Sequence, residues 1–398
     1  MADDVNCVRN YIVGANNYNS NLGNIDDKYV DQLIELFNLR HLQAKWINSL
    51  SNGQMRRARI AKALITKPRL LVIDDPFLGL DPTATKRVSD SLAQVGHQLN
   101  ISMVLGLRTH DAVPEWIEKV AYIDSEGLKE GHVETVLTEV EPPKRQPMDE
   151  ISASQIPADG AHISFNNASV VYRGLPVLKD FNWNIPKGTK WRILGDNGTG
   201  KTTILSLITA DHPQSWRSVL SIDGQLRKTG QGINVFSVNN KIGISSPEIH
   251  AVVPRHSKTM REIIRNGLVP NIGNSNFAFS GDKYEYSEWS KSILDRFADR
   301  LQKVGHRTFN DLSITDQKLC LFLRAIVKQP EILILDEAFS CMDDDVVMQK
   351  CHDIVANDMP NTTVLSIGHL DWELAPYQYM VHLLGNDARE YKLYQSKQ

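Results

Sequence analysis

The sequence predicts an α/β protein with two domains, each built around a largely parallel sheet. Three observations lead to this prediction. The chain has 398 residues, which is too long for one ordinary core. A stretch of about thirty residues occurs twice, and short apolar runs alternate with longer helical patterns. Apolar residues make up 41% and charged residues 23%, which is typical of a globular protein, so both halves should fold.

The repeat pairs residues 50–81, LSNGQMRRARIAKALITKPRLLVIDDPFLGLD, with residues 312–343, LSITDQKLCLFLRAIVKQPEILILDEAFSCMD, at an offset of 262 residues and without a gap. Ser51, Asp74 and Asp81 recur as Ser313, Asp336 and Asp343. Each copy predicts a helix followed by a buried strand, at 69–75 and 331–337, that ends in carboxylates. Chance gives few identities in one register, so the sequence contains an internal duplication.

A linker is predicted between the two copies. Residues 141–160, EPPKRQPMDEISASQIPADG, are rich in proline and polar residues and lack apolar periodicity. We therefore expect a first domain over residues 1–140 and a second over residues 161–398. The second domain begins with strand-like alternation and then, at KWRIL, a strand that leads directly into a glycine-rich turn.

Charge and cysteine content argue against several protein classes. The formal net charge is −3, so no broad basic surface for nucleic acid is expected. The four cysteines form no CxxC pair, which favours a reducing compartment and structural thiols. No apolar run approaches the roughly 20 residues of a membrane span. The acidic start MADDVNCVRN is unlike a targeting peptide, so we expect a soluble, cytoplasmic protein, or a mitochondrial one if a leader precedes residue 1.

The strongest single pattern is GDNGTGKTT at residues 195–203, a match to GxxxxGK[ST] between a strand and the apolar helix ILSLIT. Its glycines let backbone N–H groups converge on phosphate oxygens at a helix N-terminus. Lys201 would reach the β- and γ-phosphates, and the Thr202 hydroxyl would hold Mg²⁺. The flanking pattern disfavours the alternative, a glycine-rich turn without a ligand. The predicted nucleotide-binding residues are Gly195, Asp196, Asn197, Gly198, Thr199, Gly200, Lys201, Thr202 and Thr203.

Asp336 and Glu337 follow the apolar run EILIL, where a buried strand would deliver two carboxylates to the sheet edge that carries the phosphate loop. Asp336 could organise Mg²⁺, and Glu337 could orient or deprotonate the attacking water. A polar strand end without a function is the alternative. The phosphate loop upstream favours the catalytic interpretation.

These motifs together resemble the ABC-type ATPase domain. Tyr172, the phosphate loop, an LS turn before a helix, LILDE, Asp343 and VLSIGH with His369 occur in this order, and the resemblance extends over the whole chain. It implies P-loop NTPase domains with a parallel core sheet, an antiparallel β subdomain and a helical subdomain, which bind ATP with Mg²⁺. Soluble tandem ATPases of bacterial molybdate operons and their fungal relatives look most similar, because of ITADHPQSW and DDPFLGLD.

The resemblance also implies roles for two single residues. Tyr172 would stack on adenine, and His369 would contact the γ-phosphate as a catalytic residue. Each has a simpler alternative. An aromatic residue at the end of an amphipathic strand is usually part of a core, and a lone histidine is usually a surface or core residue.

In ABC-type ATPases each nucleotide lies between the phosphate loop of one domain and the signature turn of the other. The first half of this chain keeps the signature LSNGQ, with Ser51, Gly53 and Gln54, but has no phosphate loop. The second half has the phosphate loop, but its signature reads LSITD, in which branched residues and an acid replace the glycine and the amide. We therefore expect one composite site. Two further departures in the first half support a single site, because Asp75 stands in the position of Glu337 and Arg108 in that of His369.

Two departures from the family qualify this expectation. Pro247 stands where the Q-loop glutamine is expected, so the usual relay to a transporter's membrane domain would be lost. The first domain is short, incomplete, and should expose an apolar edge at residues 101–107, ISMVLGL. Either the chain is naturally truncated or residues precede Met1, and the second explanation is preferred.

The leading hypothesis is a soluble ATPase without its own membrane domain. It would close its two domains, or two copies of itself in a dimer, on Mg·ATP and act on an unidentified protein partner. One alternative is a nucleotide-sensing module that closes on ATP with little turnover. Another is a ribosome-directed ATPase of the ABC-F type, which the short, proline-containing linker disfavours.

Overall fold

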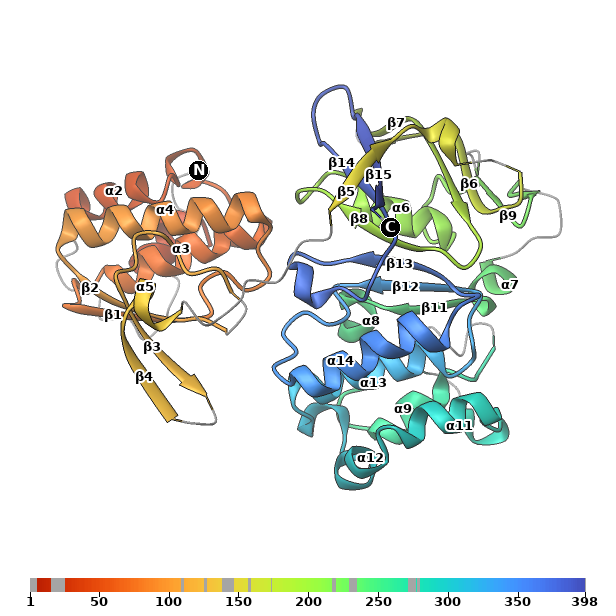
Figure 1. Cartoon of the computed structure of the whole chain (residues 1–398). Helices are drawn as coiled ribbons and strands as arrows, with labels where there is room; N and C mark the ends of the chain where they lie inside the picture. Colours follow the sequence, from red (N-terminus) through yellow and green to blue (C-terminus); the bar gives the residue numbers. More distant parts are fainter. Residues whose placement is uncertain are drawn as a thin grey trace. The chain divides into compact units, whose positions relative to one another are not determined.

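The computed structural model describes residues 6–15, 26–108, 111–124, 127–137, 147–156, 159–172, 174–216, 220–228, 235–270, 277 and 280–397. The chain divides into two compact units, Met1–Lys144 and Arg145–Gln398, and each unit is considered by itself (Figure 1).

In the first unit, helices pack on a two-stranded parallel sheet, in which Leu70 lies opposite Ser102. The helices are α1 (Val8–Val13), α2 (Asp27–Leu36), α3 (Asn52–Leu64), α4 (Pro82–Leu99) and α5 (Val133–Val136), with short 3₁₀ turns η1 (Arg40–Leu42) and η2 (Ile47–Ser49). The strands are β1 (Leu70–Asp74) and β2 (Ser102–Gly106), and a separate antiparallel hairpin is formed by β3 (Lys119–Asp124) and β4 (Gly127–His132).

Helices cover one face of the β1–β2 sheet. Side chains alternate along a strand, so Leu71 points into the helical core and is 7% exposed. The neighbouring Leu70 and Val72 point the other way and are 53% and 65% exposed, as is Val104 of β2 at 53%. Parallel strands are usually covered on both faces. Within residues 101–107, where an exposed apolar edge was expected, Val104 is exposed on the open face, whereas Ile101, Met103 and Leu105 pack against the helical core.

The second unit contains a seven-stranded sheet in the order β11-β12-β13-β8-β14-β15-β5. From β11 to β14 all neighbours are parallel, and β15 is antiparallel to both of its neighbours. The strands are β11 (Ile242–Ser245), β12 (Ile332–Asp336), β13 (Thr363–Ile367), β8 (Lys190–Leu194), β14 (Tyr379–Leu383), β15 (Tyr391–Ser396) and β5 (Met148–Ile151).

Two subdomains accompany this sheet. An antiparallel sheet in the order β10-β9-β6-β7 shares an apolar core with the parallel strands and with α6 (Lys201–Ile208). Its strands are β6 (Ala161–Tyr172), β7 (Leu175–Pro186), β9 (Leu220–Ile222) and β10 (Gln225–Leu226). A second core joins the helical subdomain to the other side of the sheet. The remaining helices are α7 (Val235–Asn240), α8 (Pro247–Val252), α9 (Met260–Asn266), α11 (Glu288–Asp295), α12 (Ala298–Val304), α13 (Ile314–Ile326) and α14 (Asp345–Asp353). The predicted fold class, a parallel core sheet with an antiparallel β subdomain and a helical subdomain, is confirmed.

The internal duplication extends to the backbone. At the offset of 262 residues, the bounds of α3 match those of α13, and the bounds of β1 match those of β12. Left-handed backbone angles recur at the same offset, with φ of +52° at Lys67 and Gln329 and +47° at Asp75 and Glu337. Positive φ is uncommon for residues other than glycine. The two copies therefore share local backbone geometry as well as sequence.

The segment 141–160 contains more structure than the linker prediction implied. Residues 138–146 lie outside the described part, but Met148–Ile151 form β5, which pairs with β15 at the edge of the sheet. Pro147 precedes the strand and its carbonyl accepts the Lys397 N–H at 3.0 Å. Proline is compatible with the start of an edge strand, so its presence did not exclude one here.

None of the described helices combines the length and the apolar composition that crossing a membrane requires.

The exposure pattern of β1 gives a paired prediction for stability. Leu71→Ala removes a buried side chain and should lower the free energy of unfolding by about 2–4 kcal/mol. Leu70→Ala, one residue earlier on the open face, should cost less than about 1 kcal/mol. Urea denaturation of both variants measures the difference, and equal losses would contradict the assignment of the two faces.

Candidate functional site

The loop between β8 and α6 has a backbone that requires glycine. Gly195, Gly198 and Gly200 have φ of +156°, +83° and +103°. A Cβ atom on Gly195 would lie 2.5 Å from Thr199 Oγ1, and one on Gly200 would lie 3.1 Å from Val177 Cγ1. The loop therefore has both the conformation and the close packing that exclude larger residues.

This loop turns its polar groups toward the start of α6. Lys201 Nζ donates to the carbonyl oxygens of Gly195 at 2.6 Å and Asp196 at 3.0 Å, so its ammonium group lies across the loop. Thr199 Oγ1 donates to the Asp196 carbonyl at 2.9 Å. Gly200 caps α6 without a side chain. A helix N-terminus and a lysine at one point form a site for an anion such as a phosphate group.

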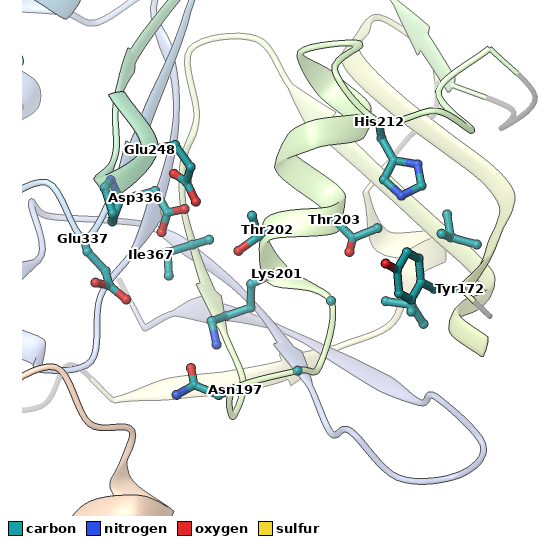
Figure 2. Close-up of a pocket in the computed structure, with 15 residues that line it drawn as sticks. Tyr172, Asn197, Lys201, Thr202, Thr203, His212, Glu248, Asp336, Glu337 and Ile367 are labelled. Carbon is teal, nitrogen blue, oxygen red and sulfur yellow. The ribbon is translucent and has the colours of Figure 1, made fainter. Parts of the chain in front are cut away.

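A cavity of about 350 Å³ lies beside the loop. Figure 2 shows Tyr172 and His212 on one side of it, Asp336, Glu337 and Glu248 on the other, and Lys201 and Thr202 between them. An elongated ligand with an aromatic end and an anionic end would suit this distribution. The predicted residues that line the cavity are Tyr172, Asn197, Gly198, Gly200, Lys201, Thr202, Thr203, Asp336 and Glu337, whereas Gly195, Asp196 and Thr199 shape the loop behind it.

The carboxylates of Asp336 and Glu337 have opposite environments. Asp336 is 7% exposed, and burial raises its pKa to about 7, helped by the negative charges of Glu337 and Glu248. A hydrogen bond from His369 lowers the pKa of Glu337, whose Oε1 lies 3.0 Å from His369 Nε2. Glu337 is therefore ionised and oriented, while Asp336 is a buried carboxylate that lacks sufficient positive charge nearby.

The backbone fixes the position of Glu337. Its φ is +47°, its N–H donates to the Ile367 carbonyl at 2.8 Å, and its carbonyl accepts Lys318 Nζ at 2.7 Å. Strained residues of this kind persist where neighbouring structure holds them. The turn directs the Glu337 side chain into the cavity, where it meets His369.

The donor set at this end of the cavity fits a magnesium ion. Mg²⁺ prefers oxygen ligands and is usually held by one or two carboxylates together with substrate phosphates. The Thr202 hydroxyl and the Asp336 carboxylate both line the cavity. The raised pKa of Asp336 marks a carboxylate that a cation would compensate. Thr202 and Asp336 are therefore the residues that would hold the ion.

Ser51, Gly53 and Gln54 lie in the other compact unit, at the start of α3. Ser51 Oγ accepts the Gln54 N–H at 3.4 Å, and Gln54 Oε1 accepts the Ser51 N–H at 3.0 Å. Ser51 is exposed, and its own O–H can donate outward. Gly53 also has a packing role, because a Cβ atom there would lie 3.0 Å from the Ala84 Cβ.

At the corresponding helix start in the second unit, the polar side chains are hydrogen-bonded to neighbouring groups of the same unit. Ser313 Oγ donates to Asp316 Oδ2 at 2.8 Å and accepts the Asp316 N–H at 3.1 Å. Asp316 is 6% exposed and pairs with Arg300 at 2.5 Å. The charge of this acid is compensated by Arg300, and its carboxylate accepts the Ser313 O–H that an anion would use.

Several residues of the cavity were missed by the sequence reasoning. They are Val170, Val177, His212, Glu248 and Ile367, and Pro247 was noticed only as a departure. His212 follows α6 in ADHPQSW, and its Nδ1 accepts the Gln214 N–H at 3.1 Å. A polar residue just after a phosphate-loop helix was the available signal for His212. Glu248, exposed beside Pro247, had no such signal.

The environment of Asp336 predicts a pH-dependent stability difference in the absence of nucleotide and divalent cations. The pKa of Asp336 is higher in the folded state than in the unfolded state, so stability is lost as the pH rises toward 7 and the buried carboxyl ionises. Asparagine does not ionise. The free energy of unfolding of Asp336→Asn should therefore be close to that of the wild type near pH 4. At pH 8 it should exceed the wild-type value by about 2–4 kcal/mol. Urea denaturation across this range is the measurement. Exposed Asp387→Asn is the control, and a gain that does not change with pH would contradict the prediction.

Comparisons with known proteins agree with this geometry. A family model described as ABC transporter matches residues 3–78 and 178–340. The uncharacterized ABC transporter ATP-binding protein YDR061W of Saccharomyces cerevisiae is 33% identical over 410 residues, covering 94% of this chain and 74% of that protein. The ABC transporter ATP-binding protein ModF of Escherichia coli is 31% identical over 328 residues, covering 78% of this chain and 64% of ModF. The chain thus spans just under two thirds of ModF.

Among solved structures, one chain of a model of ribosome-bound archaeal Pelota and ABCE1 aligns with 97% of this chain and 60% of its own length, at a TM-score of 0.62 and 14% identity. At this identity the likeness shows the fold alone. The fold, the phosphate loop and the sequence relatives agree that this chain belongs to the ABC transporter family of ATP-binding proteins.

Proposed function

We propose that this chain hydrolyses ATP at one composite site. The cavity of the second unit would bind Mg·ATP, and the start of α3 would complete the site, either from the same chain or from a second copy. In this proposal residues 1–140 form a partial ABC-type domain and residues 161–398 a complete one, to whose sheet β5 of the segment 141–160 also belongs.

The residues of the cavity have the chemistry that this proposal needs. Tyr172 would stack on adenine, and the loop with Lys201 would bind the phosphates. The bound Mg²⁺ would neutralise phosphate charge. Glu337 is ionised and would orient and deprotonate the attacking water. His369, 3.0 Å from Glu337, would hold that carboxylate in place and donate toward the γ-phosphate.

The observation that carries the single-site proposal is the contrast between the two duplicated helix starts. At α3, the Ser51 hydroxyl is exposed and receives the Gln54 N–H. At α13, the Ser313 hydroxyl is bonded to the carboxylate of Asp316, which is itself paired with Arg300. A γ-phosphate could use the first helix start, whereas at the second it would have to displace a carboxylate that is buried and paired with the partly exposed Arg300.

The same contrast holds for the catalytic positions. Arg108 follows β2 as His369 follows β13, but Arg108 Nη2 pairs with Asp111 Oδ1 at 3.0 Å. Asp75 takes the backbone conformation of Glu337 with a shorter side chain. The first unit would therefore complete the site rather than carry out the chemistry.

Pro247 supports a role other than that of a conventional transporter motor. It is the first residue of α8 and lines the cavity with a side chain that has no amide to contact a cation or a membrane partner. The cycle of closure and opening would instead act on a protein partner that remains to be identified.

Glu337→Gln tests the catalytic assignment. The change keeps the size of the side chain and removes its basicity, so kcat should fall at least about 100-fold. ATP affinity should stay within about threefold, because the phosphate loop is unaltered. Steady-state phosphate release and equilibrium binding of a fluorescent ATP analogue measure the two quantities. Binding without turnover in the wild type would instead favour a nucleotide-sensing module.

Ser51→Arg and Ser313→Arg test the single-site arrangement. Both serines are N-caps of duplicated helices, so both changes should cost a similar stability of about 1 kcal/mol. Only Ser51→Arg should reduce ATP turnover, by about tenfold or more, because it fills the helix start that would face the nucleotide. Equal loss of turnover from both substitutions would contradict the model.

A further inference from the structure

The second candidate site lies in the second unit, at the beginning of β12, where three segments meet. His162 is near the start of β6, Asp223 is in the turn between β9 and β10, and Glu331 immediately precedes β12. One ligand atom from each of the three lies within 4.8 Å of the others. Asp336 ends the same strand, five residues after Glu331, so this cluster is about 17 Å from the nucleotide cavity.

His162 directs a buried, unsatisfied nitrogen toward the two carboxylates. Its side chain is fully buried, and no described group lies within hydrogen-bond distance of Nε2. Nε2 is 3.7 Å from Asp223 Oδ1 and 3.9 Å from Glu331 Oε2. These separations are too long for hydrogen bonds. Leaving such a group without a partner costs about 1–3 kcal/mol, so the arrangement requires an explanation.

The same separations are close to those between two ligands of one metal ion. Nitrogen and oxygen ligands lie about 2.0–2.2 Å from zinc, which places tetrahedral neighbours about 3.3–3.6 Å apart. A small inward movement of the two carboxylates would close the difference. Both carboxylate side chains are 37% exposed, so an ion could enter from solvent and a water molecule could complete the coordination.

Neighbouring groups hold His162 as metal-ligating histidines are usually held. Nδ1 lies 2.7 Å from Thr363 Oγ1, and this hydroxyl also accepts the Gly188 N–H at 3.0 Å. A hydroxyl oxygen has two lone pairs, so it can accept Nδ1–H as well and leave the Nε2 lone pair for a metal. Burial lowers the pKa of His162.

The backbone fixes the other two ligands. The Asp223 N–H donates to the His162 carbonyl at 2.8 Å, and the Glu331 N–H donates to the Lys241 carbonyl at 2.9 Å. The ligand positions are therefore determined by sheet pairing and need no loop rearrangement. Sites supported in this way pay little conformational entropy when the ion binds.

Two lysines are the alternative partners of the carboxylates. Lys241 Nζ is 3.4 Å from Asp223 Oδ2, and it lies 3.2 Å from Oε1 and 3.4 Å from Oε2 of Glu331, so it contacts both oxygens of that carboxylate. Lys187 Nζ is 3.8 Å from Glu331 Oε2. Both lysines are about half exposed and can swing into solvent. A divalent ion would compete with them for the carboxylates and would also satisfy Nε2, to which neither lysine is bonded.

We propose that His162, Asp223 and Glu331 form a binding site for a divalent transition-metal ion of the zinc type. The imidazole disfavours Mg²⁺ and Ca²⁺, which prefer oxygen ligands. The bound ion would connect the antiparallel subdomain, through β6 and the β9–β10 turn, to the start of a core strand. This site is independent of the proposed ATP chemistry.

The test is titration of the chelator-treated full chain with Zn²⁺, by calorimetry and by competition with a coloured zinc chelator. The proposal expects one Zn²⁺ bound per chain at this site, at least tenfold weaker in Asp223→Asn and in Glu331→Gln. These changes replace partly exposed carboxylates with amides of the same shape, so the fold should be retained. Co²⁺ should give the intense visible bands of four-coordinate cobalt, and these bands should disappear in both variants.

Lys241→Met separates a metal site from a plain ion-pair network. Removing the competing ammonium group should tighten Zn²⁺ binding several-fold, whereas loss of an ion pair alone would not change it. Exposed Asp387→Asn is the control and should leave this binding unchanged. The proposal is overturned if Zn²⁺ does not bind, if Asp223→Asn and Glu331→Gln bind it as the wild type does, or if Lys241→Met fails to tighten binding.

Discussion

The nucleotide cavity depends on how the carboxylates at the end of a fully buried strand are compensated. Burial makes an ionised carboxylate costly unless positive charge or hydrogen bonds surround it. Glu337 accepts a hydrogen bond from His369, which lowers its pKa so that it stays ionised, whereas burial raises the pKa of Asp336. In the proposed mechanism this difference gives the two acids different tasks. Glu337 would act on water, and Asp336 would bind a cation.

The duplication shows that shared backbone geometry does not preserve shared chemistry. α3 and α13 have matching bounds, and Asp75 and Glu337 share a left-handed turn. Yet Ser313 is bonded to Asp316, while Ser51 presents its hydroxyl to solvent. Helix caps and strand turns are maintained by local packing, so they persist after the groups that bind a ligand have changed. The two halves therefore share local backbone geometry, but their helix starts offer different polar groups to a ligand.

The sequence predicted what depends on local pattern. Apolar runs predicted the buried strands, glycine spacing predicted the phosphate loop, and the repeat predicted the matching helices. It did not predict contacts that depend on tertiary packing. The pairing of Asp316 with Arg300 depends on how α12 and α13 pack, and the convergence of His162 with Glu331 depends on strand order. Strand β5 was missed because nearby prolines and polar residues resemble a linker, although an edge strand tolerates them.

Strand β12 has five residues, all of them buried, between a cluster of charged groups at its start and the carboxylates of the cavity at its end. Because side chains alternate along a strand, inserting or deleting one residue would turn all those beyond it to the opposite side of the sheet. Evolution can thus replace the residues at either tip one at a time. It cannot add or remove a single residue between them without turning the groups at one end away from their site.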